Sequence, residues 1–106
     1  ADDMMIVRGV NVFPSQIEEL ILQRPNLAPH YVCELHKEGP MDTLTVRVEL
    51  KADSHTDASG ALGAQAALAH AIKSYIGINA TVKIEATGVS ERSVGKARRV
   101  IDLRSK

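Results

Sequence analysis

Lys96 is the residue whose neighbours most strongly suggest chemistry. It follows Gly95 and stands close to Arg92, Arg98 and Arg99 near the end of the chain. An ammonium group among guanidinium groups attracts phosphate or carboxylate oxygens. The segment therefore predicts an anion-binding arm, with Lys96 as its central charge and the three arginines as supporting anion ligands. A solvated basic surface near a chain end is an equally common interpretation of such a run.

The Gly-Lys pair does not belong to a phosphate-binding P-loop. That motif needs a glycine five residues before the pair and a Ser or Thr after it. Here Gly88 is seven residues before Gly95, and Ala97 follows Lys96. Any role for Lys96 must come from its own ammonium as a point charge, and not from a nest of backbone N–H groups.

Length and composition indicate one ordinary globular domain. The chain has 106 residues, of which 44% are hydrophobic and 25% charged. Its 13 basic and 13 acidic side chains cancel, so no overall field would draw it to nucleic acid or to an anionic membrane. It has no apolar run near the roughly 20 residues of a membrane span and no basic-then-apolar leader. We expect a cytoplasmic domain, and its opening on Asp2-Asp3 after a single alanine, just before an apparent strand, suggests a piece of a longer protein.

Metal and nucleophile signatures are absent from the sequence. Cys33 is the single cysteine, which excludes an intrachain disulfide and a cysteine-cluster zinc site and suits a reducing compartment. We expect it in the core. No serine stands in a Gly-x-Ser-x-Gly elbow. No metal site is expected either, because metal-ligand spacing is missing among the four histidines, His30, His36, His55 and His70.

The N-terminal part predicts a short hairpin followed by a helix. Strands at 4–7 and 10–14 would turn at Gly9. A glycine there serves either a turn with positive φ or a ligand that passes close to the backbone, and the turn is the commoner reason. Ser15 and Glu18 have the spacing of a capping box, which predicts a helix from 15 to 23 that Pro25 stops.

The rest of the chain predicts a sheet with a second helix. Strands at 31–36 and 43–50 should form an antiparallel hairpin, and a strand at 81–86, a loop at 87–97 and a short element at 98–103 should follow. Between them an alanine-rich helix should end near Gly77 as its C-cap. Its buried stripe would be Ala61, Ala64, Leu68, Ala71, Ile72 and Tyr75. The order predicts an α+β fold, a small mixed or antiparallel sheet with the helices packed mainly on one face, preceded by the short two-stranded hairpin.

Two motifs together resemble the ends of a known module. Residues 8–18 read Arg-Gly-Val-Asn-Val-Phe-Pro-Ser-Gln-Ile-Glu, and residues 95–102 read Gly-Lys-Ala-Arg-Arg-Val-Ile-Asp. They resemble the C-terminal lid domain of phenylacetate-CoA ligase, within the acyl-CoA synthetase superfamily of adenylate-forming enzymes. The resemblance covers nearly the whole chain, and the first motif is specific to the phenylacetate branch. It implies a lid domain over residues 1–106, with a hinge and hairpin at 1–14, an αββαβ core at 15–86 and a catalytic-lysine arm at 87–106.

The resemblance also implies roles for single residues. Enzymes of this family join a carboxylic acid to ATP, release pyrophosphate, and then pass the acyl group to coenzyme A, while the small domain rotates between the two half-reactions. By position, Lys96 would assist adenylation, Asp2 would be the hinge, and Gly9 would lie on the loop that faces the CoA tunnel. Two positions depart from the pattern: the Gly-Arg pair before the double aspartate is missing, and Glu91-Arg92 replaces the usual Pro-Arg, which makes the arm less rigid.

The partners implied by the resemblance are those of a complete enzyme. ATP with Mg²⁺, CoA and an aromatic carboxylic acid would be its substrates, and an N-terminal adenylation domain would hold them. The isolated domain would be inactive and would need no cofactor, and homodimerisation is left open. The alternative is a ferredoxin-like regulatory or ligand-binding module without catalysis, for which the isolated domain would have to bind a small molecule. Zero net charge and three aromatic residues disfavour a nucleic-acid partner.

Overall fold

The computed structural model describes residues 4–52, 56–86 and 99–104. Asp2, Arg92, Lys96 and Arg98 lie outside these residues. Within them, two helices and six strands follow in the order β1 (Met5–Val7), β2 (Val10–Val12), α1 (Pro14–Leu22), β3 (Leu27–Glu38), β4 (Met41–Leu50), α2 (Ala58–Tyr75), β5 (Thr81–Glu85) and β6 (Val100–Asp102).

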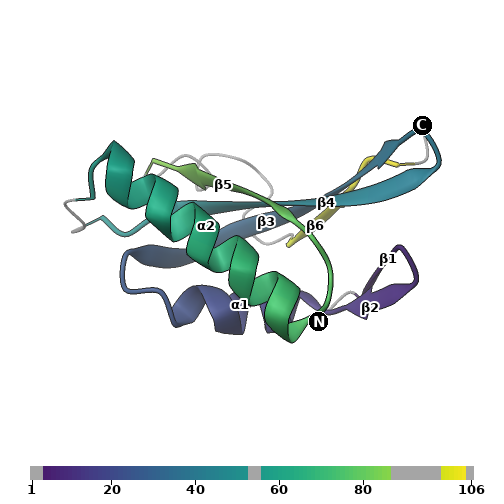
Figure 1. Cartoon of the computed structure of the whole chain (residues 1–106), viewed down its shortest axis with the longest axis horizontal. Helices are drawn as coiled ribbons and strands as arrows, with labels where there is room; N and C mark the ends of the chain where they lie inside the picture. Colours follow the sequence, from purple (N-terminus) through teal and green to yellow (C-terminus); the bar gives the residue numbers. More distant parts are fainter. Residues whose placement is uncertain (1–3, 53–55, 87–98, 105–106) are drawn as a thin grey trace.

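The described strands form two sheets. The larger is four-stranded in the order β5-β4-β3-β6, with β3 and β4 antiparallel, β5 parallel to β4, and β6 parallel to β3. The smaller is the antiparallel pair β1-β2, which lies beside the end of the large sheet where β3 turns into β4 (Figure 1). Both helices lie on one face of the large sheet (Figure 1). The predicted α+β class, with its leading hairpin and a mixed sheet, is confirmed.

One apolar core joins the helices, the large sheet and the hairpin. Alternate residues of β3 and β4 point to the helices, as the pleat of a strand requires. They pack against the inner faces of α1 and α2, and the inner side of the hairpin adds to the same cluster. The buried members are Met5, Val7 and Val12 of the hairpin, Ile17, Leu20, Ile21, Leu68, Ala71 and Ile72 of the helices, Leu27, Tyr31, Cys33, Leu35, Leu44, Val46, Val48 and Val82 of the sheet, and Ile78 of the turn after α2.

The start of α1 differs from the predicted capping box. The helix begins at Pro14 with Phe13 as its N-cap, and the Gln16 Oε1 atom accepts a hydrogen bond from the Phe13 backbone N–H at 2.9 Å. Proline favours the first helical position because its φ is already helical and its missing N–H needs no partner there. Ser15 is therefore inside the first turn, and the prediction that Ser15 caps the helix with Glu18 as its capping-box partner is wrong, because Phe13 and Gln16 hold those two positions.

The end of α2 agrees with one prediction and corrects another. Ile76 is the C-cap, and Gly77, predicted there, follows it with a φ of +96° and donates its backbone N–H to the carbonyls of Ile72 and Lys73, as a glycine that ends a helix does. Tyr75, predicted in the buried stripe, is 76% exposed. The helix ends at this residue, and Ile78 of the following turn occupies a buried position instead.

A network of hydrogen-bonded charged side chains, here called the Glu34 network, lies on the sheet face opposite the helices. Arg47 of β4 donates from Nε to Glu34 Oε2 at 2.7 Å and from Nη1 to Glu85 Oε2 at 3.1 Å. His36 Nε2 lies 3.1 Å from Glu34 Oε1. Burial alone would raise the pKa of Glu34, but its hydrogen bonds with Arg47 and His36 outweigh burial and hold that pKa below its usual value.

Tyr31 connects β3 to α1 through its hydroxyl. The hydroxyl lies 3.2 Å from the Pro14 carbonyl oxygen and 3.0 Å from Glu18 Oε1, to which it donates. Burial, with the nearby Glu18 carboxylate, raises the pKa of Tyr31.

We expect Tyr31→Phe to lower the free energy of unfolding in urea by about 1 kcal/mol, because a buried hydrogen bond is lost. Tyr75→Phe is the matched control and should be neutral, and equal effects of the two changes would contradict this role of Tyr31.

The Glu34 network should make the free energy of unfolding depend on pH in the acid range. Because the pKa of Glu34 is lower in the folded than in the unfolded chain, its contribution is present above the unfolded value of about 4.3 and is lost as pH falls through the folded value. Glu34→Gln should cost about 1 kcal/mol at pH 7, the upper range for a partly exposed ion pair. The stabilities of the two proteins in urea should converge at acid pH, once Glu34 is protonated in the folded chain as well. Glu38→Gln, at the exposed end of the same strand, is the control, and a Glu34→Gln difference independent of pH would refute the assignment.

Candidate functional site

The turn between β1 and β2 carries one of the predicted site residues, Gly9. Val7 pairs with Val10, so Arg8 and Gly9 are the two central residues of the turn, with φ values of +49° and +79°. Positive φ at both positions is the pattern of a type I′ hairpin turn. A Cβ built on Gly9 would meet no atom within 4 Å. The residues that the structure describes therefore leave the space on the Cβ side of Gly9 open.

Arg8 adopts a conformation that L residues with side chains rarely take. Its guanidinium donates from Nη1 to the Asp42 carbonyl oxygen at 3.0 Å and from Nη2 to the Asn79 carbonyl oxygen at 3.2 Å. These acceptors are at the start of β4 and in the loop before β5. The two hydrogen bonds fasten the turn to the large sheet and offset the backbone strain at Arg8.

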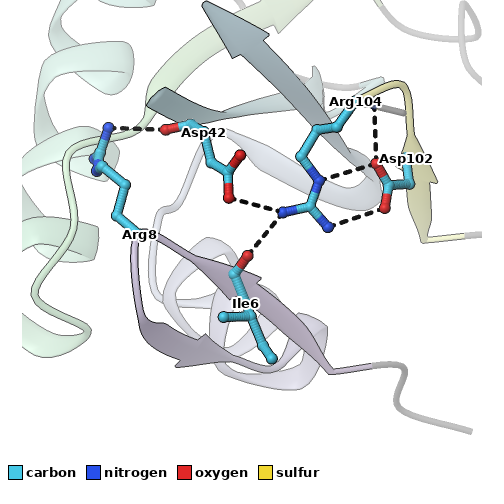
Figure 2. Close-up of polar contacts among 5 residues, drawn as sticks. All are labelled: Ile6, Arg8, Asp42, Asp102 and Arg104. Carbon is cyan, nitrogen blue, oxygen red and sulfur yellow. Dashed lines mark hydrogen bonds and ion pairs between the residues drawn. The ribbon is translucent and has the colours of Figure 1, made fainter. Parts of the chain in front are cut away.

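Arg104 makes a second and wider set of contacts at the same place. It grips the Asp102 carboxylate with two nitrogens, Nε to Oδ1 at 3.0 Å and Nη2 to Oδ2 at 2.9 Å. Its Nη1 donates to the Ile6 carbonyl oxygen at 2.9 Å and to Asp42 Oδ2 at 3.1 Å. Figure 2 shows the guanidinium between β1, the start of β4 and the end of β6. A single side chain thus joins three segments that are far apart in the sequence.

Arg99, predicted to support anion binding, contacts Tyr31 in this structure. Its Cζ lies 4.5 Å from the centre of the Tyr31 ring, in cation–π geometry, and its Nη1 donates to the Tyr31 carbonyl oxygen at 3.2 Å. Its own carbonyl oxygen accepts from the Cys33 backbone N–H at 2.7 Å. These contacts anchor the chain immediately before β6.

Cys33 is buried under this anchor. Its side chain is fully buried, and burial raises the pKa of the thiol to about 12, against a smaller opposing effect of the Arg99 charge. A thiol with so high a pKa is not a nucleophile at neutral pH. The expectation that Cys33 is a core residue is confirmed.

The structure brings together only part of the predicted site. Gly9 and Arg99 are described, and β6 links their surroundings, because it begins beside the Arg99 anchor and leads to Arg104 at the hairpin. Asp2, Arg92, Lys96 and Arg98 lie outside the described residues. Arg8, Asp42 and Arg104 were missed from the sequence. Arg104 could not be predicted, because it binds groups up to 98 residues away in the sequence. Arg8 had one local indication, a bulky residue at a turn position that favours glycine or asparagine.

Within the described residues, neither the two depressions along α1 and α2 nor a metal-ligand group adds to this site. Two shallow depressions on the helical side are lined by residues of α1 and the end of α2, and none of their lining residues belongs to the hairpin. No group of three or more His, Cys, Asp or Glu residues able to hold a metal occurs within residues 4–52, 56–86 and 99–104. In the same residues no helix combines the length and apolar character needed to cross a membrane.

Comparison with known proteins identifies relatives over the whole chain. The family described as "AMP-binding enzyme C-terminal domain" matches residues 9–104. The phenylacetate-coenzyme A ligase of Escherichia coli K12 is 49% identical over 99% of this chain, and that of Aromatoleum evansii is 46% identical over 100%. The chain spans about a quarter of the length of each relative, 24% and 25% respectively.

Solved structures agree with the sequence relatives. A domain of phenylacetate-coenzyme A ligase from Bacteroides vulgatus is 33% identical, with a TM-score of 0.88 over 99% of this chain and 96% of that one. A 2-hydroxyisobutyryl-CoA ligase, in complex with its acyl-adenylate and CoA in the thioesterification state, is 31% identical, with a TM-score of 0.86 over 98% of this chain and 22% of that one. By sequence and by fold, the chain belongs to the AMP-binding enzyme C-terminal domain family, in which its relatives are phenylacetate-CoA ligases.

Proposed function

We propose that the chain is the mobile C-terminal domain of an ATP-dependent, AMP-forming ligase that converts phenylacetate or a related aryl acetate, ATP and CoA to the acyl-CoA, AMP and pyrophosphate. The observation that carries the proposal is the match to phenylacetate-coenzyme A ligases at 46% and 49% identity over essentially the whole chain. Because the chain spans a quarter of those enzymes, the larger part would bind ATP, as its Mg²⁺ complex, and the acid. The proposed lid domain covers residues 1–106, divided at 14 and 86, and works in the cytoplasm as part of that enzyme.

In the first half-reaction, the proposed role of Lys96 is electrostatic. As the carboxylate attacks the α-phosphorus of ATP, negative charge accumulates on the phosphoryl oxygens, and an ammonium held there stabilises it where water is excluded. The Arg99 anchor supports this role, because Arg99 is fixed to Tyr31 and Cys33. Arg99 follows Lys96 by three residues in the sequence. Arg92 and Arg98 are proposed to assist as anion ligands, and Arg99 mainly through its anchoring contacts.

In the second half-reaction, the proposed role of Gly9 is steric. A Cβ added at Gly9 would meet no atom of the described residues within 4 Å, and Gly9 lies on a turn that Arg8 fastens to the sheet. A ligand chain such as the pantetheine arm of CoA could pass against it with no Cβ in the way. Asp2, just before β1, is proposed as the hinge about which the domain turns between the two half-reactions. The related 2-hydroxyisobutyryl-CoA ligase has been captured with both an acyl-adenylate and CoA, which supports this order of events.

The regulatory alternative has less support. A ligand-binding module needs a concave site with convergent polar groups. Two depressions of the described residues lie along α1 and beside the end of α2, and both are open to solvent. We therefore keep the ligase as the proposed function.

Lys96→Ala in the complete enzyme should slow adenylation by about 10² to 10³-fold, because one charge that stabilises the transition state is lost. Thioester formation from purified acyl-adenylate and CoA should stay within about twofold. Pyrophosphate exchange and single-turnover thioester assays measure the two steps, with Lys73→Ala on α2 as the control. Equal losses in both steps would count against the proposed role of Lys96.

Gly9→Ala should impair thioester formation and spare adenylation, the reverse of Lys96→Ala. In the complete enzyme we expect kcat/KM for CoA to fall at least tenfold with adenylation nearly unchanged, because the new methyl group enters the space proposed for pantetheine. Gly39→Ala is the matched control, since Gly39 also has a positive φ of +59° and open space around its Cα. Both changes should cost about 1 kcal/mol of stability from backbone strain. If the two variants had the same effect on CoA kinetics, strain alone would explain the loss.

A further inference from the structure

We propose that Arg104 is a positioning residue for the thioester-forming half-reaction, acting by holding the Gly9 hairpin in a fixed orientation on the sheet. The inference rests on the function proposed above and extends it to a residue that does not reach the substrate in this account. It assigns a role to the cluster of Ile6, Arg8, Asp42, Asp102 and Arg104 drawn in Figure 2.

The hairpin needs such a device because it is small. β1 and β2 have three residues each and form a sheet of their own. A two-stranded ribbon of this size is marginal in water without outside support. Apolar contacts of Met5, Val7 and Val12 hold its inner side to the core. Such contacts are non-directional, so they fix the position of the hairpin better than its tilt.

Arg104 supplies the directional contacts. Its Nη1 donates to the Ile6 carbonyl oxygen, two residues before Arg8, while its other two nitrogens stay on Asp102. The Arg104 backbone N–H also donates to Asp102 Oδ1 at 3.0 Å, which fixes the base of the side chain. Only 23% of the Arg104 side chain is exposed. The guanidinium is therefore held on the β6 side and points its remaining donors at the hairpin.

Asp42 connects the two arginines. Its carbonyl oxygen accepts from Arg8 and its carboxylate accepts from Arg104, at 3.0 and 3.1 Å. Arg8 enters the hairpin at the turn and Arg104 reaches it at β1, so the hairpin is held at two points against one residue of β4. Rotation of the turn about the strand axis would break at least one of these hydrogen bonds.

Lysine could not replace arginine in this role. The planar guanidinium grips Asp102 with two parallel donors and still has a third nitrogen for Ile6 and Asp42. An ammonium is a single point with three donors and cannot reach all three segments at once. A shift of about 1 Å in a group that lines a reacting centre can cost about 10²-fold in rate. The position of the Gly9 turn is therefore sensitive to the loss of these guanidinium hydrogen bonds.

The test is Arg104→Lys in the complete enzyme, which preserves the charge and removes the planar guanidinium. We expect kcat/KM for CoA, measured with purified acyl-adenylate, to fall about tenfold, while the pyrophosphate-exchange rate stays within twofold. Arg47→Lys is the matched control, because Arg47 also bridges two carboxylates, on the sheet face opposite the helices. It should leave both half-reactions within twofold.

A second variant covers the case in which Arg104→Lys does not fold. Asp42→Asn keeps the backbone carbonyl for Arg8 and an amide oxygen for Arg104, and it removes only the charge. It should lower kcat/KM for CoA about threefold and spare adenylation. Equal loss in both half-reactions, or an equal effect of Arg47→Lys, would show a merely structural role and overturn the inference.

Parallel measurements on Lys96→Ala and Gly9→Ala separate this inference from the proposed function. If those two variants divide the half-reactions and neither Arg104→Lys nor Asp42→Asn changes CoA kinetics, the positioning role is wrong and the function stands. If Lys96→Ala and Gly9→Ala do not divide the half-reactions, the proposed function fails and the inference fails with it.

Discussion

The contact of the Arg104 guanidinium with Ile6, Asp42 and Asp102 is the interaction on which the arrangement of this domain most depends. Within the described residues, β1 and β2 share no strand pairing with the large sheet. Apolar burial and a few arginine donors are therefore what the structure provides to hold the hairpin in place. β6 follows the Lys96 segment in the sequence. Through β6, the Arg104 guanidinium therefore connects the Gly9 hairpin with the C-terminal part of the chain that carries Lys96, and the proposed mechanism uses both parts. A domain that turns as one body can present one end while it withdraws the other.

The basic residues of the C-terminal segment illustrate how residues of one type can divide into different tasks. The sequence grouped Arg99 with Lys96 as an anion ligand, on charge and spacing alone. In the structure Arg99 lies over the Tyr31 ring and donates to the Tyr31 carbonyl, while Tyr31 itself contacts Glu18 and Pro14 of α1. This chain of contacts leads from the arm through β3 to the first helix. These contacts fix Arg99, and a preorganised charge is what the electrostatic role proposed for the neighbouring Lys96 would require, since such charges act without reorganisation.

Local patterns in the sequence predicted the helices and strands well, but the sequence did not predict the contacts between residues far apart in the chain. Alternation identified β3, β4 and β5, and glycines with positive φ at the hairpin turn and after α2 were readable because few other residues adopt that conformation. The predicted capping box was wrong at α1, because Pro14 starts the helix one residue earlier. The predicted burial of Tyr75 was wrong because Tyr75 is the exposed last residue of α2, and Ile78 is buried after it. The Arg8 and Arg104 contacts carry no periodic signal, since their acceptors are mostly carbonyl oxygens and carboxylates 34 to 98 residues away. Only the folded backbone brings these groups together.

Native-state hydrogen exchange of this chain tests the central claim, that hairpin and sheet form one rigid unit, most directly. If the claim holds, the hydrogen-bonded amides of β1 and β2 will exchange with the same opening free energy as those of β3 and β4, because opening the hairpin requires the whole core to unfold. If the β1 and β2 amides exchange orders of magnitude faster than those of β3, the hairpin opens alone. That result would contradict a domain in which the Gly9 turn and the end of β6 move together.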